Sequence, residues 1–248
     1  MAAAQTIRDA IADVTALRLQ RTGDRALGAA VGSVKTFQAR RFRGTYADLM
    51  ASPTFGPAAR FFLEELYSDT DYTDRDQQFG RIAGTLQTIF PQPVVNTAVA
   101  LAVLHAQTEE LDQDMGRAWL AHEGADAAND AARYTAVWRA VGQRHARQQQ
   151  LQRVLAMGTD LARLTRTPGL RMMLRMMRGP ANAAGMGALQ KFLEAGFDTF
   201  GQLARQRGGV EQFLATIEQR ERALMDLLFD ADPVTCGTQL NHTLGQAR

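Results

Sequence analysis

The sequence is poor in several features that particular protein classes require. Among its 248 residues it has a single cysteine, Cys236. One cysteine cannot form an internal disulfide, so a disulfide scaffold is excluded and a reducing compartment, the cytosol, is expected. The first residues have no cationic start followed by a long apolar run, so no secretory signal is predicted. The most apolar stretch, residues 93–104, is too short to span a bilayer.

β-branched residues are also scarce, and this decides the fold class. The chain has five isoleucines and 12 valines, whereas alanine and leucine dominate its composition. Alanine and leucine favour helices, while sheets are rich in β-branched residues. Apolar residues recur at helical spacing along most of the chain. The sequence therefore predicts an all-α protein, a single bundle of about eight to ten helices.

Turn residues divide this helical pattern into segments. Breaks are predicted at residues 22–24, 52–57, 91–93 and 167–169, where glycine, proline and serine cluster. By contrast, the stretch from 129 to 164 has no strong breaker and is predicted as one long helical run.

The segments are expected to form one domain. Residues 1–232 are predicted as a single helical domain that begins with a helical arm at 3–43. The apolar pattern from Leu189 to Leu228, interrupted by a turn near Gly208, predicts a C-terminal helical hairpin. Residues 233–248 are polar and predicted to be a flexible tail.

Charge is unevenly distributed, although the formal net charge is only +2. Residues 60–130 contain 13 acidic residues and four arginines, whereas residues 133–178 contain ten arginines and one acidic residue. We expect the two blocks to pack against each other, within one fold or across a symmetric dimer. In the alternative interpretation, the arginine block 133–178 binds nucleic acid or an anionic lipid surface.

A short segment rich in arginine and methionine is the strongest candidate for a partner surface. It consists of Arg171, Met172, Met173, Arg175, Met176, Met177 and Arg178. Flexible methionine side chains beside cationic ones suit a protein partner. In the structural alternative, the methionines fill an irregular core while the arginines face acidic helices. An anionic lipid surface and a Cu(I) site are further alternatives.

His105 is the most distinctive single residue. It ends an apolar run, and Glu109 follows one helical turn later, so the two side chains are expected on one face. This pattern is compatible with a ligand to a metal or a tetrapyrrole. A hydrogen-bonded polar pair where a helix leaves the core explains the pattern better, so His105 and Glu109 are candidate cofactor-binding residues and no cofactor is required.

Four closely spaced aspartates suggest a calcium loop at first sight. They are Asp69, Asp71, Asp74 and Asp76. The glycine and the glutamate that an EF-hand loop needs at fixed positions are missing, so this site is not predicted. Thr73 and Asp76 have the spacing of a helix capping box, and capping explains these aspartates better.

A longer pattern is similar to a known family. The stretch from Gln38 to Ile82 contains RRFRGTYADL, a proline turn, FFLEELY and TDRD. It resembles the signature of an uncharacterised proteobacterial all-helical family, and the resemblance extends over Lys35–Asp230. The family has no known activity, so the resemblance implies no catalytic residue, substrate or cofactor.

No catalytic pattern stands out in the sequence. Zinc-hydrolase, phosphate-loop and nucleophile-elbow motifs do not occur. The interpretation favoured by the sequence is a non-enzymatic cytosolic interaction or regulatory protein that binds a protein partner and forms a homodimer. The first alternative is a helical protein that binds a small molecule, a tetrapyrrole or a metal through His105.

Overall fold

The fold is known from a computed structural model that describes residues 2–65, 72–122 and 130–247. Within these ranges the regular structure is entirely helical, so the all-α prediction is confirmed. The first helices are α1 (Ala2–Gly23), α2 (Arg25–Thr45), α3 (Ala47–Ala51), α4 (Gly56–Glu65), α5 (Thr73–Ile89) and α6 (Gln92–Ala121). They are followed by α7 (Asp130–Val141), α8 (Arg144–Thr165), α9 (Leu170–Met176), α10 (Arg178–Ala183), α11 (Gly187–Leu203), α12 (Gly209–Asp230) and α13 (Pro233–Gly245).

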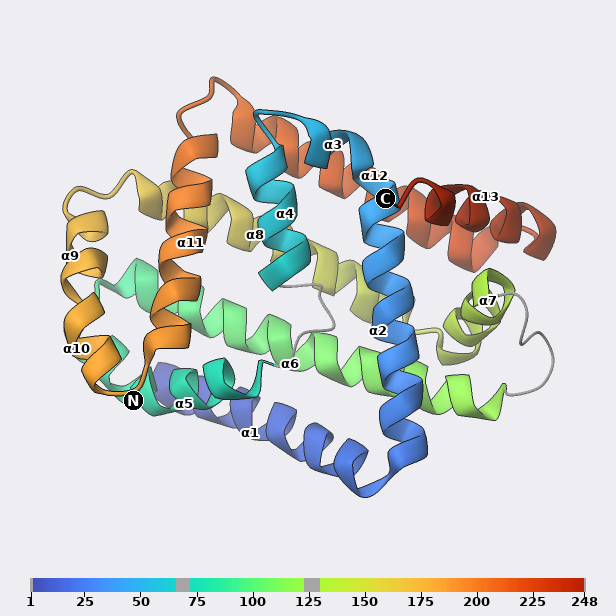
Figure 1. The fold of residues 1–248 in the computed structure, drawn as a ribbon, viewed down its shortest axis with the longest axis horizontal. Coiled ribbons are helices and arrows are strands. Elements are labelled where there is room, and N and C mark those ends of the chain that lie inside the picture. Colours follow the sequence, from blue (N-terminus) through green and yellow to red (C-terminus); the bar gives the residue numbers. More distant parts are fainter. Residues whose placement is uncertain (1, 66–71, 123–129, 248) are drawn as a thin grey trace.

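The longest helix, α6, runs through the middle of the fold (Figure 1). α1 and α2 pack against it, and α8 packs against it from another side. In the view of Figure 1, α2, α4 and α11 cross the direction of α6. Consequently α6 lies beside helices from both the N-terminal and the C-terminal parts of the chain.

Two of the predicted breaks have clear local causes. Asp24 caps α2, because its carboxylate accepts hydrogen bonds from the backbone N–H groups of Ala26 and Leu27. Pro91 precedes α6, and Pro93 lies in its first turn, where a missing N–H is tolerated. The predicted breaks at 22–24 and 91–93 are confirmed.

The long helical run predicted from 129 to 164 is wrong. The described part of this stretch divides into α7 and α8 at Gly142 and Gln143. Both residues have left-handed backbone conformations, with φ of 67° and 58°. Periodicity continues through the break, so the apolar pattern alone did not reveal it.

The predicted flexible tail is also wrong for most of its length, because residues 233–245 form α13. Asp232 caps this helix by accepting hydrogen bonds from the N–H groups of Val234 and Thr235. Cys236 and Leu240 are buried, and α13 packs against α2 and α7. Its polar residues lie on one face of an amphipathic helix, and they masked the apolar stripe on the other face.

The helix pair predicted as a C-terminal hairpin corresponds to α11 and α12. A turn that includes Gly208, at φ 70°, joins the two helices. Each packs mainly against α8. Buried Phe200 of α11 and Phe213 of α12 both lie within about 6 Å of Phe62 in α4, measured between ring centroids. None of the described helices combines the length and the apolarity needed to cross a membrane.

Candidate functional site

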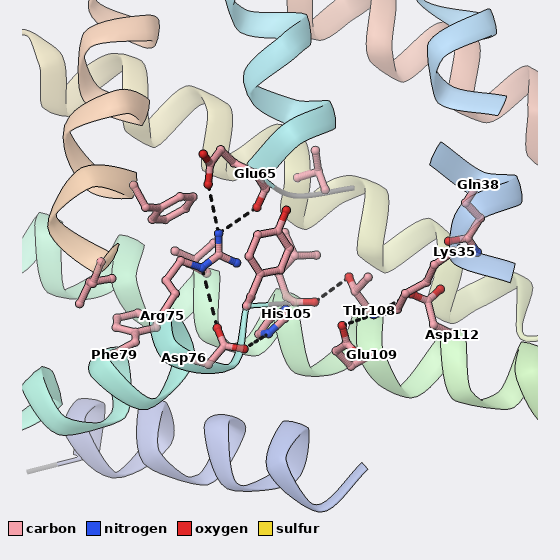
Figure 2. A pocket seen from close by; sticks show the side chains of 16 residues that line it. Lys35, Gln38, Glu65, Arg75, Asp76, Phe79, His105, Thr108, Glu109 and Asp112 are labelled. Atoms are coloured by element: carbon pink, nitrogen blue, oxygen red, sulfur yellow. Dashed lines mark hydrogen bonds and ion pairs between the residues drawn. The ribbon is translucent and has the colours of Figure 1, made fainter. Parts of the chain in front are cut away.

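Two adjoining cavities lie between the helices. The first, which we call the charged cavity, has a volume of about 60 Å³ and lies where α5 and α6 face α2, α4, α8 and α11 (Figure 2). Its polar lining residues are Lys35, Gln38, Glu65, Tyr72, Arg75, Asp76, His105, Thr108, Glu109 and Asp112. So many ionisable groups around one small space are unusual in a helical core.

Asp76 is the central acidic group of the charged cavity. It is 3% exposed, and its Oδ2 atom accepts hydrogen bonds from Arg18 Nη2 at 2.6 Å and from His105 Nε2 at 2.8 Å. Burial opposes ionisation of this carboxyl, but His105 and Arg18 outweigh it and lower the pKa of Asp76. Asp76 does not cap α5 as the sequence predicted. Its carboxylate points inward because the Arg18 and His105 side chains meet it there.

The ionised state of Asp76 defines the role of His105. A carboxylate only accepts hydrogen bonds, so the His105 ring must donate through Nε2–H. In the neutral ring the lone pair is then on Nδ1. The His105 side chain is 17% exposed and lines the charged cavity. The carboxylate therefore holds the ring in one tautomer, as second partners of functional histidines do.

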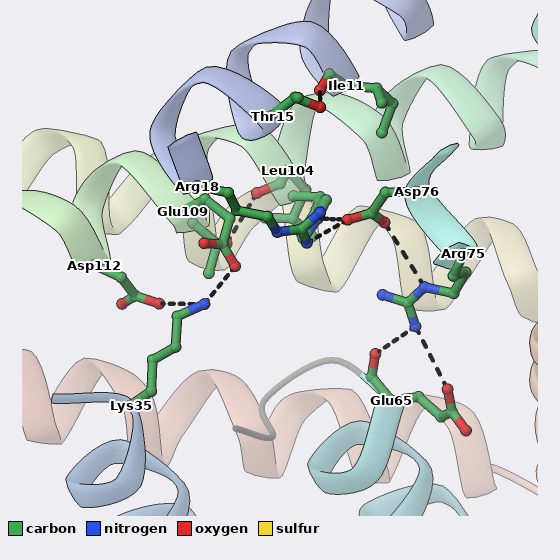
Figure 3. A network of polar contacts seen from close by, with 12 residues as sticks. Ile11, Thr15, Arg18, Lys35, Glu65, Arg75, Asp76, Leu104, Glu109 and Asp112 are labelled. Atoms are coloured by element: carbon green, nitrogen blue, oxygen red, sulfur yellow. Dashed lines mark hydrogen bonds and ion pairs between the residues drawn. The ribbon is translucent and has the colours of Figure 1, made fainter. Parts of the chain in front are cut away.

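Glu109 forms a second buried network on the same helix (Figure 3). Its two carboxylate oxygens meet Arg21 Nη1 and Lys35 Nζ, each at 2.5 Å. Burial raises the pKa of this carboxyl, but Lys35 and Arg21 outweigh burial and lower it to about 2. Glu109 is therefore held by α1 and α2, and the predicted pair between His105 and Glu109 does not form. Each of the two residues has another partner.

Asp112 lies one turn further along α6. It is 4% exposed, and its Oδ2 atom is 4.0 Å from Lys35 Nζ. Burial is the main influence and raises the pKa of this carboxyl. Asp112 thus closes the end of the charged cavity nearest α2.

Arg75 forms the opposite wall. Its guanidinium lies between two aromatic rings, 3.8 Å from the centroid of Tyr72 and 4.5 Å from that of Phe192. Its Nη1 donates to the backbone oxygen of Glu65 at 3.0 Å, and its Nε is 3.9 Å from an oxygen of Asp76. Burial lowers the pKa of Arg75. Aromatic faces on both sides hold this cation in place.

The second cavity, which we call the apolar cavity, is enclosed by α4, α5, α6, α8, α9, α10 and α11. It has a volume of about 130 Å³, and nearly all of its lining is hydrocarbon. It shares four lining residues with the charged cavity, namely Phe79, Leu101, Leu189 and Phe192. The two cavities therefore adjoin each other at these four residues.

The arginine and methionine segment has two different faces. Met177 lines the apolar cavity together with Leu170 and Leu174. Met172 and Met176 are 62% and 65% exposed.

The arginines of this segment pair within the C-terminal part of the chain. Arg171 pairs with Asp198 at 2.8 Å, and Arg178 donates to Glu194 at 2.6 Å. One part of the segment thus lines the apolar cavity, and another part is exposed on the surface. Partner binding by this segment stays a prediction.

The acidic block 60–130 and the arginine block 133–178 pack against each other as expected, because α6 contacts both α7 and α8. In the described part of the chain, however, no ion pair joins the two blocks. The acids of α5 and α6 pair with Arg18, Arg21 and Lys35 from the N-terminal helices. The charge of Arg147 in α8 also favours the ionised form of Asp112.

Several residues of the site were not predicted from the sequence. His105, Glu109 and Asp112 follow helical spacing on α6, so Asp112 could have been added from the pattern. Arg18 and Lys35 come from other helices, and nothing local marks them. Asp76 was singled out only for capping, while Asp69 and Asp71 lie outside the described residues.

Histidine and carboxylate side chains are also the common protein ligands of metal ions. In residues 2–65, 72–122 and 130–247, no three histidine, cysteine, aspartate or glutamate side chains are arranged to hold a metal ion. The Nε2 atom of His105 is already bonded to Asp76. A ligand could therefore reach this ring only through Nδ1.

Comparison with known proteins gives a family. No curated protein and no solved structure matches the chain. Residues 17–235 match a family described as Domain of unknown function (DUF8198). The match covers most of the chain, including every polar group of the two buried networks. This protein belongs to the DUF8198 family.

Proposed function

We propose that this protein binds a small molecule that has an apolar body and a polar end. The apolar body fills the apolar cavity, and the polar end reaches the charged cavity. The observation that carries this proposal is that the two cavities adjoin, because both are lined by Phe79, Leu101, Leu189 and Phe192. An apolar space beside a few converging polar groups is the usual form of a small-molecule site.

The size of the apolar cavity limits the ligand. Its volume of about 130 Å³ is close to that of an engineered cavity of about 150 Å³ that binds benzene. Many ligand pockets are larger, about 300–1,000 Å³. The apolar body is therefore a phenyl ring or a short alkyl chain. A tetrapyrrole at His105, one of the sequence alternatives, would require the surrounding helices to move apart.

Filling the apolar cavity tests the proposal. Ala98 lines this cavity, whereas Ala188 is exposed at the start of α11. Hexanol is expected to raise the melting temperature of the wild type and of the control variant Ala188→Leu. It is expected to leave Ala98→Leu unchanged, because leucine occupies the space. An equal shift in all three proteins would contradict the proposal.

The interaction role predicted from the sequence is a second candidate. Its support is the exposure of Met172 and Met176 on the outer face of α9, two of the few large apolar side chains that face solvent. If this face makes a homodimer, the double change Met172→Ser and Met176→Ser converts the dimer to a monomer. Light scattering measures this, and a wild-type monomer would contradict it.

Binding of nucleic acid or an anionic surface by residues 133–178 has less support. Arg139 donates to backbone oxygens at the C-terminal end of α12 and just after it, Arg144 pairs with Asp230, and Arg147 is buried. These groups are not free to contact phosphates. A gel shift at two salt concentrations tests the remaining surface arginines.

A further inference from the structure

Two polar groups in the charged cavity have spare hydrogen-bonding capacity, and the first is an acceptor. His105 donates Nε2–H to the ionised carboxylate of Asp76. In the neutral ring its Nδ1 atom then carries a lone pair. No side chain or backbone group in the described part of the chain donates to that atom. The charged cavity thus contains one oriented acceptor.

The second group is a donor. Arg75 uses Nη1 for Glu65 and places Nε near Asp76, and its Nη2 forms no hydrogen bond within the described ranges. Arg75 and His105 both approach the carboxylate of Asp76, one at each oxygen (Figure 2). Both side chains line the same cavity of about 60 Å³, so a small group that occupies this cavity meets both of them.

Each acidic group that lines the charged cavity has a cationic partner. The four acidic groups are Glu65, Asp76, Glu109 and Asp112. Four cations lie within 4.0 Å of them, namely Arg18, Arg21, Lys35 and Arg75. An ionised ligand group would bring an uncompensated charge into this space, and burying such a charge is costly.

We propose that the polar end of the ligand is neutral and combines a donor with an acceptor, as a hydroxyl or a carboxamide does. Its N–H or O–H donates to His105 Nδ1, and its oxygen accepts from Arg75 Nη2. A carboxylate lacks the donor that His105 needs, and an ammonium lacks the acceptor that Arg75 needs. This inference rests on the proposed function and specifies the ligand class for the same site.

Calorimetric titration of the full-length protein with four six-carbon compounds tests the inference. Hexanol and hexanamide are expected to bind at least about tenfold more tightly than hexanoate and hexylamine, because each ion leaves a buried polar group unpaired. If hexanoate or hexylamine binds as tightly as the neutral pair, this inference is overturned while the proposed function stands. If none of the four binds, both fail.

Three variants connect the preference to the named residues. His105→Phe removes the acceptor and is expected to abolish the preference for hexanol over hexanoate. His105→Gln restores an amide oxygen and is expected to recover part of it. Should His105→Phe fail to fold, Arg75→Met provides an independent measurement, because it removes the donor and is expected to abolish the preference for hexanol over hexylamine. An unchanged preference in the folded variants would overturn the assignment.

Discussion

Acidic groups meet basic ones both in the core around α6 and on the surface of α12, but in different surroundings. Glu109 and its partner Arg21 are 6% and 12% exposed, whereas Glu218 and its partner Arg222 on α12 are 42% and 53% exposed. Water replaces a lost partner at the surface, but it cannot do so in the core. The buried network therefore fixes the wall of the charged cavity, while the surface pair contributes little to the fold.

Removing one buried charge should have the largest effect. In Glu109→Gln, the cations of Arg21 and Lys35 lose their counter-charge in a buried position. We expect unfolding to become easier by about 3–5 kcal/mol. Urea denaturation followed by circular dichroism measures this. A loss as small as that of the matched surface variant Glu218→Gln would contradict the difference between the two regions.

Acid should weaken the same network. The pKa of Glu109 is about 2 in the folded protein against an ordinary value of 4.5, so its contribution is complete above about pH 4.5 and is lost as the pH falls toward 2. Converted at 1.36 kcal/mol per pH unit, this is about 3 kcal/mol. Stability measured at pH 6 and pH 3 should fall further in the wild type than in Glu109→Gln. Equal losses would show that Glu109 is not responsible.

The C-terminal helix α13 makes a buried contact with α2, and replacing a glycine in α2 tests this contact. A Cβ atom added at Gly44 of α2 would lie 1.9 Å from the backbone oxygen of Thr243 in α13. Gly44→Ala should therefore destabilise the protein by about 1–3 kcal/mol and speed thiol labelling of buried Cys236. Gly32→Ala, where the added atom meets nothing within 4 Å, is the control. Labelling at the control rate would mean that α13 is not held against α2.

The smallest effect is expected at the surface. Glu218 accepts from Arg222 one turn later on α12. Replacing Arg222 by alanine should cost about 0.3–0.5 kcal/mol, and added salt should reduce the difference. Thermal unfolding at low and high salt measures it. A cost similar to that of Glu109→Gln would mean that burial does not govern these pairs.

Local rules predicted much of the fold. The scarcity of β-branched residues gave the all-α class, and Asp24 and Pro91 marked helix boundaries that the structure confirms. The same rules failed at Gly142 and Gln143, because apolar periodicity runs through a backbone break. They failed again for α13, which depends on packing against α2 and α7.

The candidate site was only partly predictable. His105 stood out because it follows an apolar run, and it does line a cavity. The partner of His105 could not be inferred from the sequence, because Asp76 lies on another helix, α5. Glu109 is closer in the sequence, but its carboxylate pairs with Arg21 and Lys35. Residues brought together from four helices leave no local spacing to detect, and only the three-dimensional packing reveals them.

Methionine methyl signals test the ligand site most directly. Met157 and Met177 line the apolar cavity, whereas Met172 and Met176 are exposed on the nearby helix α9. In a spectrum of protein carrying ¹³C-labelled methionine methyl groups, hexanol should shift the signals of Met157 and Met177 saturably. The signals of Met172 and Met176 should stay in place. Shifts confined to the exposed pair, or no saturable shift at all, would contradict ligand binding in the cavities.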